Sequence, residues 1–112
     1  MNYKFKYNEN TTFKDARAYL DELKKANVVE FILSDINRIL NFLEVEELPS
    51  KGGSAIRFQH KILKGHPHYH EGIFSIHVKH KGGDQKIISK NDFKFYMLPA
   101  LIQIIDLLDK QK

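Results

Sequence analysis

Residues 54–80, SAIRFQHKILKGHPHYHEGIFSIHVKH, contain two runs of alternating hydrophobicity separated by a loop-like stretch. Polar and apolar residues alternate in the first run, Ser54–His60, and again in the second, Gly72–His80. This alternation is typical of a strand with one buried face. The glycine and proline within Lys64–His68 indicate a loop. We therefore predict two antiparallel strands joined by a long loop.

Three segments around these strands have apolar residues at three- and four-residue steps, which predicts helices. The first runs from Thr12 to Asn27, with Thr11 or Thr12 as its N-cap, and the second from Ser34 to Leu43. The terminal helix should begin near Leu98, because a proline at position 99 is tolerated only in a first turn.

Shorter patterns complete the expected fold. Tyr3–Tyr7 alternates lysine with aromatic residues, as in an edge strand or extended arm, and Gln85–Ser89 predicts a third short strand. Turns are expected at Pro49–Gly53 and Lys81–Asp84. The sequence predicts an α+β fold in which a small antiparallel sheet of two to three strands packs against helices.

The composition indicates one soluble domain spanning residues 1–112. The chain is 42% hydrophobic, which is enough for one core, and it has no cysteine for a disulfide or a thiolate metal site. No stretch is apolar enough for a signal peptide or a membrane span. We expect a cytoplasmic protein that does not associate with membranes.

Positive charge is concentrated in the middle of the chain. Residues 1–50 carry seven Lys or Arg against nine Asp or Glu, a net charge of −2, whereas residues 51–96 carry nine against three, a net charge of +6. Such a concentration favours contacts with phosphates, although lysines on a sheet face can also serve solubility alone. Nucleic acid is therefore one candidate ligand.

All six histidines lie within 21 positions, at residues 60, 66, 68, 70, 77 and 80. His66, His68 and His70, beside Glu71, have ligand types suited to zinc, but the neighbouring glycine and proline favour an ordinary solvated loop. We therefore assign no metal and no other cofactor to the chain, and keep a metal site in this loop as an alternative.

His77 and His80 end the second predicted strand with the spacing H-x-x-H, so in a regular strand they project to opposite faces. His77 shares its face with Ser75 and Lys79. It is a candidate general base, although an exposed histidine without a function fits equally well. The Gly52-Gly53-Ser54 stretch followed by Arg57 could contact a phosphate, or be a plain entry to a strand.

The chain also resembles the HicA toxins, over roughly residues 31–108. The residues that carry the resemblance are Asp35-Ile36, Ile39-Leu40 and Leu43, then Gly53-Ser54-Ala55-Ile56-Arg57-Phe58, then Ile76-His77-Val78-Lys79-His80-Lys81-Gly82, and finally Leu98, Leu101 and Ile104-Ile105. This resemblance implies a double-stranded-RNA-binding-like core of order α-β-β-β-α, preceded here by an N-terminal helical extension at residues 1–30.

The resemblance further implies a metal-independent endoribonuclease that cleaves mRNA until a HicB-like antitoxin covers its active site. His77 or His80 would be the base that takes the ribose 2′-hydroxyl proton. Ser54, Arg57, Lys79 and Lys81 would bind the RNA, with Arg57 and Lys79 steadying the phosphate.

One position departs from the family. The glycine-serine stretch of HicA toxins usually continues with the histidine that acts on RNA, and Ala55 occupies that position here. Some relatives instead keep a Gly-Ser-Arg type of stretch and place histidines in an H-x-x-H at the end of the later strand, as His77 and His80 do. The alternative is a non-catalytic nucleic-acid or protein interaction module with the same fold.

Overall fold

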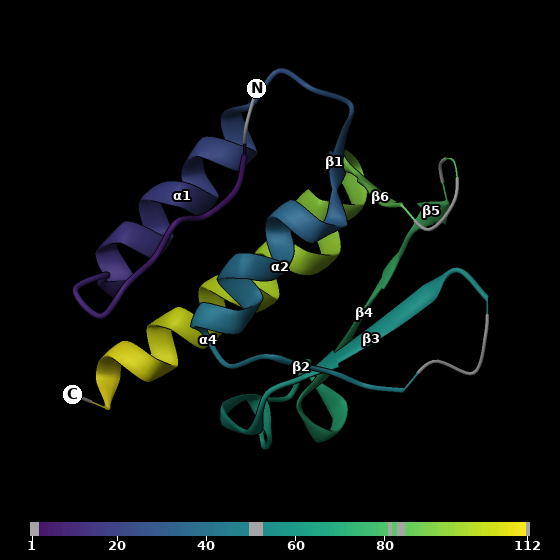
Figure 1. Ribbon diagram of the computed structural model, residues 1–112. Helices are drawn as coiled ribbons and strands as arrows, with labels where there is room; N and C mark the ends of the chain where they lie inside the picture. The colour runs from purple at the N-terminus through teal and green to yellow at the C-terminus, as the bar shows by residue number, and fades with distance from the viewer. Residues whose placement is uncertain (1–2, 50–52, 81, 83–84, 112) are drawn as a thin grey trace.

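The computed structural model describes residues 3–49, 53–80, 82 and 85–111. It has the mixed α+β architecture expected, with helices packed against antiparallel sheets (Figure 1). The outermost helix is α1 (Phe13–Lys25), and α2 (Leu33–Phe42) and the C-terminal helix lie between it and the strands (Figure 1). Among the described residues, the helices cover one face of the strands (Figure 1).

The first helix begins where the sequence indicates. The Thr12 hydroxyl accepts a hydrogen bond from the Asp15 N–H (3.2 Å), and the Asp15 carboxylate accepts one from the Thr12 N–H (2.9 Å). This capping box satisfies two N–H groups that a helix start otherwise leaves without partners. The buried stripe of α1 packs against α4 (Leu98–Lys110) and consists of Ala16, Tyr19, Leu20 and Leu23.

The strands form two three-stranded antiparallel sheets, more strands than the sequence predicted. One has the order β2 (Glu46–Glu47), β3 (Ala55–Gln59), β4 (Ile73–His77), and the other β1 (Glu30–Ile32), β6 (Lys86–Ser89), β5 (Lys79–His80). The strand β5 follows β4 after a single residue, Val78, so the chain passes directly from one sheet to the other within residues 73–80. The third predicted strand is confirmed as β6, whereas β2, with two residues, was too short to give a pattern of its own.

The C-terminal helix begins earlier than predicted. It runs as α3 (Lys90–Asp92), a π-helical segment (Phe93–Met97) and α4 (Leu98–Lys110), and the Ser89 hydroxyl caps it by accepting from the Asp92 N–H (3.0 Å). A proline ring normally clashes with the carbonyl four residues earlier in a helix. Here the preceding turn is widened, because the Leu98 N–H bonds to the Phe93 carbonyl five residues back, so Pro99 does not end the helix.

The N-terminal arm is extended, but residues 3–7 form no strand. Its carbonyl groups are bound by side chains: Tyr19 donates its hydroxyl hydrogen to the Tyr3 carbonyl, and Arg38 Nε donates to the Phe5 carbonyl (2.8 Å). The buried Phe5 ring lies between Tyr19 of α1 and Phe42 of α2. The arm thus fills the seam between these two helices.

The connection from β3 to β4 is a loop, as predicted, with two 3₁₀ turns at Lys61–Leu63 and His70–Gly72. His60 fixes its start: the buried imidazole donates from Nε2 to the Leu43 carbonyl (2.8 Å) and accepts at Nδ1 from the Ile62 N–H (3.0 Å). Its end is fixed by the Gly72 carbonyl, which accepts from the His60 N–H (3.1 Å). The loop is therefore anchored at both ends.

Buried side chains from the arm, all the main helices and β1, β3, β4 and β6 form one contiguous apolar cluster. The proposed extension, residues 1–30, contributes Phe5, Leu20 and Leu23 to it. No helix within the described residues is long and apolar enough to cross a membrane. The predicted turn at Pro49–Gly53 lies partly outside the described residues, as does the one at Lys81–Asp84.

Candidate nucleic-acid interface

The uncovered face of β3 and β4 carries the candidate residues. Side chains alternate along both strands, so that Ile56 and Phe58 of β3 face the helices with Phe74 and Ile76 of β4. The opposite face is solvent-exposed and presents Ala55, Arg57, Ser75, His77 and, at the start of β5, Lys79. A hydroxyl, an imidazole and two cationic groups thus share one open surface.

The register of β3 and β4 brings His77 directly opposite Ala55. The Val78 N–H donates to the Ser54 carbonyl (2.8 Å), so the adjacent pair, Ala55 and His77, is a non-hydrogen-bonded pair. Side chains are closest in such pairs, with Cβ atoms about 4.5–5.5 Å apart. The imidazole of His77 therefore lies beside the methyl group of Ala55. A larger side chain at position 55 would occupy part of the same space.

Arg57 lies two residues along β3 from Ala55 and pairs with Ser75. Arg57 is thus a diagonal neighbour of His77 on the same face, within reach of a long side chain. Its Nη2 donates to the Pro49 carbonyl (3.3 Å). Within the described part of the chain, Arg57, His77 and Lys79 form no ion pair with a carboxylate.

The other sequence candidates lie around this surface. Ser54 is exposed just before β3, and the backbone of Gly53 before it has a φ of +89°. His80 is exposed on β5 and pairs with Lys86, and strand alternation directs it to the face opposite that of His77. Lys81 lies outside the described residues. The structure therefore brings Arg57, His77 and Lys79 together but not His80.

A groove beside His77 adds residues that the sequence reasoning missed. It encloses about 440 Å³ between the β4 strand, the preceding loop and the π-helical segment, and its walls include His68, Tyr69, Ser75, His77, Phe95, Tyr96 and Pro99. Phe95 is 63% exposed and Tyr96 55% exposed. Within the run FKFYM, only Phe93 and Met97 are buried. That four-residue spacing was the sequence signal that Phe95 and Tyr96 lie off the apolar stripe.

The histidine-rich loop is organised by its own backbone. Nδ1 of His66 accepts from the His68 N–H (3.2 Å), and its ring lies 5.1 Å from that of Tyr69, centroid to centroid. No three His, Asp or Glu side chains converge in a metal-binding arrangement anywhere in the part of the chain that the structure describes. In this loop, Nδ1 of His66 therefore accepts a hydrogen bond that stabilises the turn.

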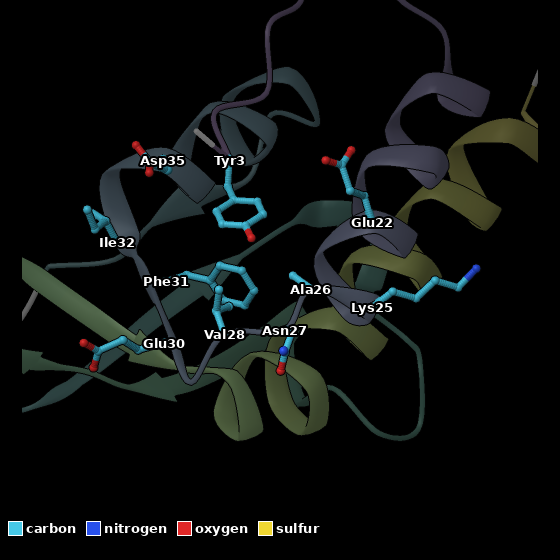
Figure 2. A pocket seen from close by; sticks show the side chains of 10 residues that line it. All are labelled: Tyr3, Glu22, Lys25, Ala26, Asn27, Val28, Glu30, Phe31, Ile32 and Asp35. Carbon is cyan, nitrogen blue, oxygen red and sulfur yellow. The ribbon is translucent and has the colours of Figure 1, made fainter. Parts of the chain in front are cut away.

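A second, larger cavity of about 760 Å³ lies between the N-terminal arm, the end of α1 and β1. Figure 2 shows the rings of Tyr3 and Phe31 at its centre, with the carboxylates of Glu22 and Asp35 on either side. Glu30 is a third carboxylate in its lining. Among its described residues, the lining has one cationic side chain, Lys25, against these three carboxylates, so the cavity repels a polyanion and does not suit nucleic acid despite its size.

Comparison with protein-family models, with curated proteins and with solved structures found no match.

Proposed function

We propose that this protein is a HicA-like toxin that binds RNA and cleaves mRNA without a metal ion, with His77 as the general base. The observation that carries the proposal is the pairing of His77 with Ala55. HicA toxins usually have their acting histidine at the position of Ala55. An imidazole on the facing residue of the next strand reaches the same open surface, so one histidine would replace another across the strand pair.

The order of the elements supports this proposal. From α2 the chain continues through β3, the β4 and β5 run, and β6 to α4, in the α-β-β-β-α order of the double-stranded-RNA-binding-like core. The arm, α1 and β1 precede or flank that core, and β2 is a short addition to its edge. The positive charge concentrated in residues 51–96 suits an RNA backbone.

In the proposed reaction, the imidazole of His77 takes the proton of a ribose 2′-hydroxyl. The 2′-oxygen attacks the adjacent phosphorus and the bond to the 5′-oxygen breaks, so the products carry a 2′,3′-cyclic phosphate and a 5′-hydroxyl that has taken a proton from water. The hydroxide left by that water takes the proton from His77 and restores the imidazole. Arg57 and Lys79 lie on the same face and would stabilise the charge that develops on the phosphate oxygens.

Of the two candidate histidines, His77 suits this role better than His80. His77 shares its face with both cationic groups, whereas His80 extends from the opposite face at the end of β5. We therefore expect His77→Ala to abolish cleavage and His80→Ala to leave most of it.

Induced expression of the wild type and these variants in a bacterial host tests the proposal, with growth and the integrity of a reporter mRNA as readouts. The sharpest variant combines Ala55→His with His77→Ala, which moves the imidazole to the facing strand. We expect growth arrest from the wild type and from this double variant, but not from His77→Ala alone. Healthy cells with intact mRNA on wild-type expression would contradict the proposal.

The alternative function is a non-catalytic RNA-binding module, favoured by the absence of a histidine at position 55. Such a module would bind RNA with an affinity that falls steeply with salt, and would release no cyclic phosphate. For the toxin, a HicB-like antitoxin is the proposed protein partner, and the cytoplasm is the proposed location. Co-expression with the product of a neighbouring gene that relieves the growth arrest would support the partner.

A further inference from the structure

We infer that the groove between β4 and the π-helical segment is a nucleobase-binding site, and that the RNA it takes is single-stranded. This inference rests on the proposed function, because it names the substrate class at the same surface. Phe95 and Tyr96 line the groove, and more than half of each side chain is exposed. Single exposed apolar residues are common on protein surfaces, but neighbouring exposed aromatic side chains that line one groove are typical of an interaction site.

The chemistry of the groove suits an unpaired base. An aromatic side chain offers its face for stacking, which is the main sequence-tolerant contact that proteins make with single strands. Ser75 and His77 lie in the same groove and carry hydrogen-bonding groups that suit the edge of a base. Its volume of about 440 Å³ is within the usual range for small ligands, about 300–1,000 Å³.

The charges around the groove favour a polyanion over a basic or neutral partner surface. No Asp or Glu is among the described residues that line it. Lys94 has its Nζ 5.9 Å from the centre of the Phe95 ring, and Lys79 follows His77 on the same face of the strand. A base held at Phe95 or Tyr96 would thus have cationic groups near its phosphates and the His77 imidazole near its ribose.

A double helix does not fit this arrangement, because its bases are stacked on one another and do not expose their faces. The proposed binding therefore differs from shape recognition of duplex RNA, in which the protein contacts phosphates and 2′-hydroxyls across the groove. A loop or an unpaired stretch of mRNA is the expected substrate.

The test measures binding of the full-length protein to a short fluorescent RNA in which every ribose is 2′-O-methylated. This RNA lacks the attacking hydroxyl, so binding is measured whether or not the protein is a ribonuclease. We expect the single strand to bind at least about tenfold more tightly than the same strand in a duplex. Phe95→Leu and Tyr96→Leu should each raise the Kd by about tenfold, as expected for loss of one stacked base.

Two controls make the result specific. Tyr7→Leu changes another exposed aromatic residue, far along the chain on the N-terminal arm, and should leave the Kd unchanged. Removing one base at a time from the RNA should identify a position whose loss weakens binding to the wild type but has little further effect on the Phe95→Leu variant. Circular dichroism checks that each variant is folded, as expected for exposed positions.

The outcomes separate the two proposals. Equal affinity for duplex and single strand, wild-type affinity of both leucine variants, or no RNA binding at all would each overturn the groove inference. If binding depends on Phe95 and Tyr96 but unmodified RNA stays intact with the wild type, only the proposed cleavage fails. If RNA is cleaved but neither leucine variant changes affinity, the cleavage stands and the exposed aromatics belong to a protein partner.

Discussion

Gly72 lies where the loop after β3 returns to begin β4, and its backbone φ is +73°. Side chains disfavour this conformation by about 1–2 kcal/mol. A Cβ at this position would also lie 2.5 Å from the backbone oxygen of His60, closer than nonbonded contact allows. Both effects act on His60 and Gly72, the hydrogen-bonded pair at the loop end of β3 and β4.

We therefore expect Gly72→Ala to lower the free energy of unfolding by about 3 kcal/mol or more. Gly65→Ala is the matched control, because Gly65 has a φ of +90° but no atom within 4 Å of an added Cβ. Gly65→Ala should lower the free energy of unfolding by about 1–2 kcal/mol, which is the cost of the positive φ alone. Urea unfolding of the two variants measures the difference, and equal losses would contradict the clash.

The histidines show how much of the site the sequence could predict. Strand alternation alone indicated that His77 lies on the exposed face with Ser75 and Lys79, and the structure confirms it. The pairing with Ala55 was beyond prediction, because it depends on where the loop closes. His60 reads in the sequence as one more polar strand residue, yet its two ring nitrogens are both bonded inside the protein.

Among the elements, the N-terminal arm depends most on one side chain. Tyr19 of α1 is buried. Its ring lies 4.9 Å from that of Phe5, centroid to centroid, and its hydroxyl donates to the Tyr3 carbonyl. Burial is the main cause that raises the pKa of Tyr19 above its ordinary value of 10.0, and the charges of Asp35 and Glu22 add to it. The arm is thus held by a hydroxyl that must remain protonated.

Tyr19 should therefore contribute to the loss of stability at alkaline pH. Above about pH 10 the unfolded chain loses this proton while the folded protein keeps it, so the free energy of unfolding falls as the pH rises. Tyr19→Phe should lower the free energy of unfolding by about 1 kcal/mol at neutral pH, because the hydrogen bond is lost. Above about pH 10, the free energy of unfolding of this variant should fall less steeply than that of the wild type. Urea unfolding at several pH values measures both slopes, and parallel curves would contradict the assignment.

The elements themselves were predictable to different degrees. The helix α1 has a capping box and a regular apolar stripe, so its start was found at Thr12. The start of the C-terminal helix was misjudged by eight residues, from Leu98 to Lys90, because Pro99 was taken to mark a first turn. A widened turn that accommodates a proline leaves no local signature in the sequence, since it arises from hydrogen bonding across five residues.

At the scale of the whole molecule, the N-terminal segment belongs to the same core as the rest. Leu20 is 1% exposed and Leu23 fully buried, and α1 packs directly on α4. At the rim of this contact, Arg17 forms ion pairs with Asp106 (2.6 Å) and Asp109 (3.1 Å). The apolar contact should contribute far more to stability than these exposed pairs.

We therefore expect a fragment lacking residues 1–30 to lose cooperative unfolding, because the apolar face of α4 would be open to water. The control is Arg17→Ala in the full chain, which removes the ion pairs but keeps the apolar contact, so that variant should still unfold cooperatively. Thermal unfolding followed by circular dichroism, with NMR dispersion of the fragment, measures both. A fragment that unfolds as sharply as the full chain would contradict a shared core.

The widened turn at Phe93–Met97 also sets the rotational phase of the helix around it. In an α-helix each residue turns the direction of the side chains by about 100°. Closing this turn to regular α-helical spacing with no change in the number of residues would rotate everything before it by about that angle relative to α4. Phe95 and Tyr96 would then no longer face the groove together, so the wider turn itself keeps both rings at the groove.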